Sequence, residues 1–464
     1  MRVLMLGWEF PPFISGGLGT ACYGLTKAMS EIGTEVLFVL PKPVEPQHGS
    51  HVRILSPHSA CGIAGSACGY ELEEMEHIKF CAVQAGSGIS PYHTPEQYEQ
   101  MMKERGHRVR VLSRGDEPIE KGSPFEQHAN PGCSVKVQPN AKTHTQAPQN
   151  ASDYEGDLFH QIEQYARLAT AVAAREHFDV IHAHDWMTYR AGIAVSALSG
   201  KPLVVHIHST EFDRSGEHVN QPIYDIERQG MHFAQRVIAV SHLTKNIVMS
   251  RYGLPNEKVE VVYNAIDLNG STHTLPLTPI RRDEKLVLFL GRITMQKGPE
   301  YFLEAAKKVL DVMENVRFVM AGWGDMIRQT IEMAAEMNIG HKVLFTGFLR
   351  GGDVERVFRM ADLYVMPSVS EPFGIAPLEA MSNDVPVLIS KQSGVSEVIQ
   401  HALKVDFWDV NEMANKIIAV LRHRPLHNTL REQGKVDLRR LSWTDSARQC
   451  VNIYQQAITA TTYA

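Results

Sequence analysis

The sequence predicts an α/β protein built from two doubly wound domains, and three observations support this fold class. Short apolar runs, which are typical of buried parallel strands, alternate with helical patterns in both halves of the chain. Glycine-rich turns follow several of these runs, as they do where a strand leads into a helix. A segment rich in Asn, Ser, Thr and Pro, residues 267–282, lies between the halves and is typical of a linker.

The first half opens with an apolar strand at residues 2–7, and the glycines Gly16 and Gly17 follow it. A helix comes next, because Ala21 and Leu25 share one face at helical spacing. Further strands are expected at 35–40, 180–182, 203–207, 237–240 and 259–262, with a helix over 158–175. The order strand, glycine turn, helix, strand is the usual opening of a doubly wound domain.

The second half repeats this order more regularly. Residues 286–290 are all apolar, as a strand buried on both faces requires. A helix from Pro299 to about Glu314 follows, since Phe302 and Ala306 recur at helical spacing and proline suits a first helical turn. Further strands are expected at 316–321, 343–346, 363–366 and 387–389.

We therefore divide the chain into three parts. These are an N-terminal Rossmann-like domain over 1–267, a C-terminal Rossmann-like domain over 283–440, and a last helix within 441–464, which we expect to pack on the first domain. Residues of about 86–156 are rich in Pro, Gln, Asn and His, so we expect a polar insertion with one short strand at 108–112. The carboxyl ends of both sheets are expected to face one cleft, because ligands bind there in open α/β sheets.

Composition excludes several classes of protein. Of the 464 residues, 44% are hydrophobic and 21% charged, which is ordinary for a globular protein. The net charge of -6 argues against a nucleic-acid partner. The six cysteines are scattered and form no C-x-x-C pair, which favours reduced thiols and a reducing compartment. No signal peptide and no run of about 20 apolar residues is recognisable, so we expect a cytoplasmic protein without a membrane segment.

The strongest motif is residues 370–381, which directly follow an expected strand and open a helix. It carries Glu371 and Glu379, with Gly374 between them to let a ligand approach the backbone. A carboxylate that accepts bonds from neighbouring sugar hydroxyls gains about 1.5–3 kcal/mol for each charge-assisted bond. In the alternative interpretation, Glu371 is an acid near a helix N-cap and Glu379 faces solvent.

A second motif is Gly291–Gly298, which also follows a strand and precedes a helix. Its Arg292 and Lys297 can hold a diphosphate without a metal ion, because arginine offers a fork of donors and lysine a point charge. The alternative is that both are ordinary surface cations. Gly322 opens a similar turn after the next strand, but a lone G-x-G is weak evidence.

Two polar clusters follow strands of the first half. One contains His182, His184 and Asp185, and the other contains His206 and His208. Two histidines spaced H-x-H on a strand face the same way and could bind zinc. The chain has no H-E-x-x-H motif and no D-x-D carboxylate pair, so we expect no metal site and no cofactor. The turn around Gly16 and Gly17 lacks the G-x-G-x-x-G spacing, which disfavours a NAD-dependent dehydrogenase.

These motifs together resemble the GT-B fold retaining glycosyltransferases of group 1, the group that includes glycogen and starch synthases. The segments that resemble the glycogen synthase-like branch are Gly7–Pro12, Gly16–Gly19 and Asp179–Trp186. The resemblance covers nearly the whole chain except the expected insertion. Two departures are Ser15, where glycogen synthases usually carry lysine, and a shortened segment after Ile399 that lacks the usual glycine-rich strand.

The resemblance implies a role for each candidate residue. Arg292 and Lys297 would hold the donor diphosphate, Glu371 the sugar hydroxyls and Glu379 the ribose. The backbone at Phe373, Gly374 and Ile375 would contact sugar and phosphate, and Gly16, Gly17, Gly291 and Gly322 would allow close approach of the donor. His208 matches the family histidine beside the donor sugar, and Asp185 lies where the acceptor is expected.

The implied enzyme is a hexosyltransferase. It would move a sugar, glucose by resemblance, from an ADP-, UDP- or GDP-linked donor to a carbohydrate hydroxyl with retention, and an α-glucan is the expected acceptor. The alternatives are a GT-B enzyme with a small-sugar or lipid-linked acceptor, a sugar-nucleotide epimerase, and a non-catalytic carbohydrate- or nucleotide-binding protein.

Overall fold

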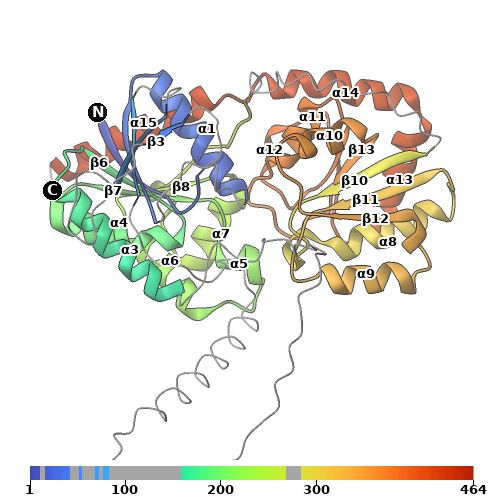
Figure 1. The fold of residues 1–464 in the computed structure, drawn as a ribbon, viewed down its shortest axis with the longest axis horizontal. Helices are drawn as coiled ribbons and strands as arrows, with labels where there is room; N and C mark the ends of the chain where they lie inside the picture. The colour runs from blue at the N-terminus through green and yellow to red at the C-terminus, as the bar shows by residue number, and fades with distance from the viewer. Residues whose placement is uncertain are drawn as a thin grey trace, which may run out of the picture. The chain divides into compact units, whose positions relative to one another are not determined.

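The computed structural model describes residues 1–10, 16–41, 52–54, 68–72, 77–82, 158–267 and 284–462. Residues 1–86 and 159–464 form one compact unit, which contains both sheets of the protein (Figure 1). The insertion expected at about 86–156, with its short strand at 108–112, lies outside the described residues. No helix among the described residues is long and apolar enough to cross a membrane.

The first sheet has nine strands in the order β3-β4-β5-β2-β1-β6-β7-β8-β9. Six are parallel strands that the sequence predicts, with bounds that differ by at most two residues: β1 Arg2–Leu6, β2 Glu35–Leu40, β6 Val180–His184, β7 Leu203–Ile207, β8 Arg236–Ala239 and β9 Val259–Val261. The edge strands β3 (Val52–Ile54), β4 (Cys68–Leu72) and β5 (Ile78–Ala82) were not predicted. Both pairings of β4 are antiparallel, whereas β5 runs parallel to β2.

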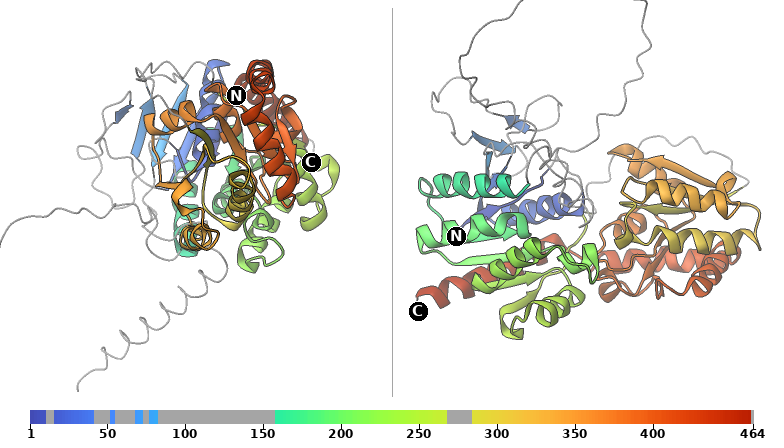
Figure 2. Two further views of the ribbon diagram at one scale, coloured as in Figure 1. Left: turned by 90° about the vertical axis from the view of Figure 1, so that its right-hand side faces the viewer. Right: turned by 90° about the horizontal axis from the view of Figure 1, so that it is seen from below.

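The second sheet is parallel, in the order β12-β11-β10-β13-β14-β15. Figure 2 shows the segments of this half, coloured yellow to red, from two further sides. Its strands are β10 Lys285–Leu290, β11 Val316–Ala321, β12 Val343–Gly347, β13 Leu363–Met366, β14 Val387–Ser390 and β15 Leu403–Val405. Five of them were predicted. Strand β15, which lies after Ile399, was not predicted; it pairs with β14 and contains no glycine. One mostly parallel sheet and one fully parallel sheet, both surrounded by helices, confirm the predicted α/β fold class.

Helices lie between most of the strands. Their bounds are α1 Gly17–Glu31, α3 Leu158–Ala173, α4 Trp186–Ser199, α5 Glu211–Ser215, α6 Gln221–Phe233, α7 His242–Tyr252, α8 Pro299–Leu310, α9 Ile327–Glu336, α10 Gly352–Met360, α11 Ala376–Ser382, α12 Val395–Val398, α13 Val410–Arg422, α14 Arg424–Leu438 and α15 Trp443–Thr462. Short 3-10 turns include η2 (Asn256–Lys258), η3 (Met295–Lys297) and η4 (Gly340–Lys342). Helix α8 ends four residues before the expected end. The backbone N–H groups of Val312 and Met313 both donate to the backbone oxygen of Val309, which closes the helix in a tighter turn.

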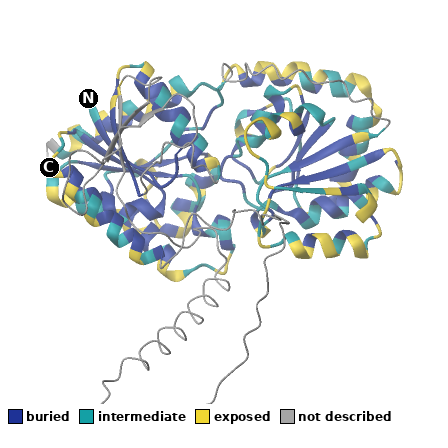
Figure 3. Ribbon diagram, in the orientation of Figure 1, coloured by how far each residue is buried: buried dark blue, intermediate teal, exposed yellow. Residues whose placement is uncertain are grey.

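Burial on both faces explains why the central strands of the second sheet are mostly apolar (Figure 3). Along β10, Val287 and Phe289 belong to a core cluster shared with α8 and α13. Leu286 and Leu288 belong to another cluster, shared with α10 and α11. Successive side chains on a strand point to opposite faces, so each face of β10 packs on its own layer of helices.

Helix α15 covers one face of the first sheet. At its start, Trp443 fills the space beside Gly24 of α1, where a Cβ atom would lie 2.3 Å from the indole ring. Further along, the hydroxyl of Tyr454 bonds with Nδ1 of His182 on β6. The opposite face of the same strands packs on α4, whose Gly192 lies against Leu203 and Ala183.

Candidate functional site

The loop after β10 carries Arg292 and Lys297 and folds around Gln296. The Gln296 side chain is buried and accepts a hydrogen bond from Arg292 Nη2 at 3.1 Å. Its backbone oxygen accepts a 2.9 Å bond from the N–H of Val369, which follows β13. Gly298 ends the loop at φ 62°, and a Cβ there would lie 2.4 Å from the oxygen of Pro367. The loops after β10 and β13 are therefore packed directly on each other.

Lys297 and Glu371 form an ion pair that joins the two strongest motifs of the sequence. The Glu371 carboxylate is 9% exposed and also accepts a 3.2 Å bond from the Ser368 hydroxyl. The main chain of Glu371 is held by bonds with Gln392 and Gly394, in the loop after β14. The lysine side chain retains 20% exposure. A cation and a carboxylate are thus fixed side by side at the carboxyl end of the second sheet, with solvent in reach of the cation.

The turn after Glu371 adopts a conformation that needs glycine. Gly374 has φ 103°, and a Cβ there would lie 3.1 Å from the Glu371 side chain. Phe373 is buried, and Ile375 is half-buried at the start of α11. Glu379 lies in the first turn of α11, and burial raises the pKa of its carboxyl above the ordinary value. The Glu379 side chain is half-buried rather than fully exposed to solvent.

Gly322 permits a close approach of two neighbouring loops. A Cβ at this position would lie 1.8 Å from the backbone oxygen of Gly291, so no other residue fits between the loops after β10 and β11. The loops are also joined by the N–H of Ile293, which donates to Trp323 at 3.0 Å. In the first sheet, Gly17 begins α1, and a Cβ on it would meet no atom within 4 Å.

Asp185 and His208 meet at the carboxyl ends of β6 and β7. Asp185 has φ 56°, a backbone strain that costs on the order of 1–3 kcal/mol in a residue other than glycine. Its carboxylate accepts bonds from the backbone N–H of His208 at 2.7 Å and of Ser209 at 3.4 Å. Burial raises the pKa of Asp185 to about 7, against the opposing effect of these N–H donors. Burial lowers the pKa of His208 to about 3, so its ring is neutral at neutral pH.

His208 is the last member of a histidine ladder, which we define as His182, His184, His206 and His208. His184 and His206 are directly opposite each other on β6 and β7. Their neighbours His182 and His208 lie two residues away on the same face. Adjacent rings are stacked or tilted with centroids 4.2–5.3 Å apart. His184 Nδ1 lies 2.9 Å from His208 Nε2.

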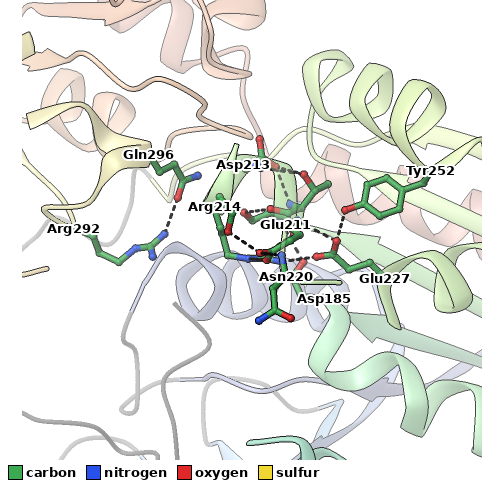
Figure 4. Close-up of polar contacts among 12 residues, drawn as sticks. Asp185, Glu211, Asp213, Arg214, Asn220, Glu227, Tyr252, Arg292 and Gln296 are labelled. Carbon is green, nitrogen blue, oxygen red and sulfur yellow. Dashed lines mark hydrogen bonds and ion pairs between the residues drawn. The ribbon is translucent and has the colours of Figure 1, made fainter. Parts of the chain in front are cut away.

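Sequence reasoning missed a buried ion cluster around Arg214 on α5 (Figure 4). The guanidinium group pairs with Glu211 at 3.1 Å and with Glu227 at 2.5 Å. Figure 4 shows the Tyr252 hydroxyl pointing to Glu227, with which it forms a hydrogen bond. The sequence did offer one signal for this cluster: the charged residues from Glu211 to Arg214 follow the buried strand β7 within a few positions. Glu227 could not be found in the same way, because it lies on the next helix.

The Arg214 cluster borders the loop after β10, residues 291–298, which carries Arg292 and Lys297 and which we call the basic loop. Burial raises the pKa of Glu227 to about 7, while Arg214 opposes that change by favouring the carboxylate. Asp213, on the same short helix, accepts a 2.5 Å bond from the hydroxyl of Ser370, the residue before Glu371. Gly216, at the end of α5, approaches Met295 of the basic loop. The first sheet thus contributes side chains beside both motifs of the second.

Three further contacts connect α7 with the second sheet. The Ser241 hydroxyl donates to the oxygen of Pro372 at 2.6 Å. The Glu397 carboxylate accepts from the backbone N–H groups of His242 and Leu243 at 2.9 and 2.8 Å, and therefore caps the N-terminus of α7. Among the described residues, no hydrogen bond or ion pair joins Gly16 or Gly17 to Lys297 or Glu371.

One mostly parallel and one fully parallel sheet, with polar residues in the loops at their carboxyl ends, define a GT-B type of fold, and comparisons with known proteins agree. Residues 276–437 match the family described as glycosyl transferases group 1. Residues 97–269 match glycosyltransferase family 4. The two matched regions follow each other along the chain, one in each half, and together they identify a glycosyltransferase of the GT-B type.

Individual relatives extend the likeness to the whole chain. An uncharacterised glycosyltransferase of Methanocaldococcus jannaschii is 29% identical over 99% of each chain. Among solved structures, sucrose-phosphate synthase of Thermosynechococcus elongatus has a TM-score of 0.67 at 18% identity, covering 99% of each chain. The catalytic domain of starch synthase IV from Arabidopsis thaliana, bound to ADP and acarbose, also has a TM-score of 0.67, at 16% identity and 99% coverage of each chain.

Proposed function

We propose that this protein is a retaining hexosyltransferase that moves a sugar from a nucleotide diphosphate sugar to a carbohydrate hydroxyl. In this proposal residues 283–440 hold the donor and residues 1–267 hold the acceptor. The observation that carries the proposal is the ion pair between Lys297 and Glu371. It unites the loops after β10 and β13, and it offers a cation for phosphate oxygens beside a carboxylate for sugar hydroxyls.

Donor binding would exchange the partners of this ion pair. In the structure, Lys297 pairs with the nearly buried Glu371 carboxylate. A diphosphate would take over Lys297 and Arg292, and the released carboxylate would accept bonds from the sugar hydroxyls. Ser368, already bonded to Glu371, would keep the carboxylate oriented during this exchange. Glu379 would accept bonds from the ribose, and the backbone at Phe373, Gly374 and Ile375 would contact sugar and phosphate.

Retention would follow from departure and attack on the same face of the sugar. The described residues offer positive charge for the leaving diphosphate in Arg292 and Lys297, which is where negative charge develops in the transition state. The leaving phosphate would accept the proton of the acceptor hydroxyl. His208 would contact the donor sugar through a neutral ring, because burial lowers its pKa. Asp185, which holds the His208 backbone, would face the acceptor.

An α-glucan is the acceptor we favour, as in a glycogen synthase-like enzyme. The likeness to starch synthase IV supports this choice, together with the sequence segments Gly7–Pro12 and Asp179–Trp186. A small-sugar acceptor is the second candidate, because sucrose-phosphate synthase is equally similar in fold. This chain differs from strict glycogen synthases at the position before Gly16, where it has Ser15 and those enzymes usually have lysine.

A turnover screen tests the proposal. ADP-, UDP- and GDP-linked sugars are each incubated with glycogen, maltooligosaccharides or simple sugars, and nucleotide release is measured with and without acceptor. The expected result is release that depends on an acceptor and prefers one donor nucleotide. Equal release without acceptor would indicate hydrolysis or epimerisation, and no release from any donor would contradict the transferase proposal.

A further inference from the structure

The histidine ladder brings three imidazole rings close together in the core. One ring nitrogen from each of His182, His184 and His206 lies within 4.8 Å of the other two. All three side chains are at most 2% exposed. The sequence shows no linear metal-binding motif because the ligands come from two neighbouring strands, and only the register of β6 and β7 brings them together.

Four ring nitrogens in this group have no hydrogen-bond partner among the described residues. They are Nε2 of His182, Nε2 of His184, and both nitrogens of His206. A buried polar group without a partner costs about 1–3 kcal/mol, so a stable core needs something to occupy these atoms. Each of the three histidines therefore presents at least one nitrogen that is available to a ligand.

The remaining nitrogens of the first two histidines are already engaged. His182 Nδ1 bonds with the hydroxyl of Tyr454, and His184 Nδ1 bonds with His208 Nε2. Metal-binding histidines almost always use their second nitrogen in this way, because the bond fixes the tautomer and turns the other lone pair toward the metal. The geometry thus leaves Nε2 of His182 and of His184 as the natural ligand atoms.

We propose that His182, His184 and His206 bind one divalent transition-metal ion, with zinc as the expected occupant. Neutral imidazole suits zinc, and three histidines leave one position of a tetrahedral site for a fourth ligand. Asp185 follows His184 and is bonded to the backbone of His208, so it places a carboxyl beside the ladder. The ion would tie β6, β7 and, through Tyr454, helix α15 together behind His208.

This proposal is independent of the donor site and is tested by binding rather than by turnover. The full-length protein is stripped with a chelator, then titrated with Zn²⁺ and separately with Co²⁺. Bound metal is counted by mass spectrometry after gel filtration, and Co²⁺ absorption reports the coordination geometry. We expect one ion per chain, a tetrahedral cobalt spectrum and a raised midpoint of thermal unfolding.

Three variants define the site. His206→Gln is expected to lose stoichiometric binding. Tyr454→Phe keeps the ring that packs on β6 but removes the partner of His182, and should weaken metal affinity about 10–100-fold. His232→Gln is the matched control, because that histidine bonds with the backbone of Tyr252 outside the ladder, and it should bind like the wild type.

Near-ultraviolet circular dichroism establishes that each variant is folded, and Tyr454→Phe carries the test if His206→Gln does not fold. Failure of the wild-type protein to bind either ion stoichiometrically would overturn the proposal and leave buried water as the partner of the free nitrogens. Unchanged binding by both His206→Gln and Tyr454→Phe would also overturn it.

Discussion

At the scale of single residues, the sequence was informative where a charged side chain directly follows a strand. Arg292, Lys297 and Glu371 were chosen because they lie in loops that follow strands, and Glu379 because it follows Glu371 at the start of the next helix; Lys297 and Glu371 form an ion pair. The uncharged residues that hydrogen-bond to these side chains could not be predicted. Gln296 bonds to Arg292 and Ser368 bonds to Glu371, but neither residue stands out in the sequence. Their roles depend on a bond between the loops after β10 and β13.

Lys297→Ala should lower turnover by about 10²–10³-fold, because one positive donor to the developing charge is lost. The measurement is the initial rate of nucleotide release with the preferred donor and acceptor. Lys307→Ala is the matched control: this lysine lies on α8 in an exposed pair with Asp311, and its loss should leave the rate unchanged. Wild-type turnover in a folded Lys297→Ala protein would exclude Lys297 from the donor site.

Glu379 should give nucleotide binding a pH dependence. Burial raises its pKa in the ligand-free protein, and only the carboxylate accepts bonds from both ribose hydroxyls. Affinity should therefore be complete well above the raised pKa, and should weaken as the pH falls through it. Titration calorimetry of a nucleoside diphosphate at several pH values measures this change in affinity. The Glu379→Gln variant should bind the nucleotide more weakly, and its affinity should no longer depend on the protonation of residue 379. An identical pH profile in the variant would assign the effect to another group.

At the scale of elements, periodicity predicted the parallel strands, because strands buried on both faces are continuous apolar runs. Strands β3 to β5, at one end of the first sheet, were missed because none of them is a continuous apolar run, and the pairings among them are antiparallel. Strand β15 was missed because it has only three residues and no glycine to mark it. The histidine ladder escaped linear motifs because its members are spread over two strands.

The packing of α15 on α1 gives a prediction for stability. Gly24→Ala would place a Cβ 2.3 Å from the Trp443 ring, and overpacking of this kind costs about 1–3 kcal/mol. Chemical denaturation measures the free energy of unfolding. Gly340→Ala is the control, because its nearest neighbours would lie 3.9 Å away, at an ordinary contact distance. Equal stability of the two variants would mean that Trp443 does not occupy this space in solution.

At the scale of the whole molecule, the two-sheet architecture was predictable from the repeated alternation of strands and helices. The contacts that connect the sheets were not. Asp213 with Ser370, and Glu397 with the N-terminus of α7, join residues more than 150 positions apart. No local pattern distinguishes Glu397 from any other exposed glutamate.

Glu397→Ala should weaken the connection between α7 and the second sheet. Loss of a carboxylate that caps a helix N-terminus costs about 0.5–2 kcal/mol, and the effect should also raise KM for the donor, because Pro372 and Phe373 adjoin the same contact. Unfolding free energy and steady-state kinetics measure both effects. Glu432→Ala, on the exposed face of α14, should change neither. A stability change without any change in KM would separate this contact from the donor site.

The central claim, a retaining transferase with its donor held between Lys297 and Glu371, is tested most directly by nuclear magnetic resonance of the transfer product. The wild-type protein is incubated with its preferred nucleotide sugar and acceptor, and the anomeric configuration of the newly linked sugar is recorded as it forms. The account predicts one new glycosidic bond with the configuration of the donor. An inverted product, or free sugar formed at the same rate with and without acceptor, would contradict it.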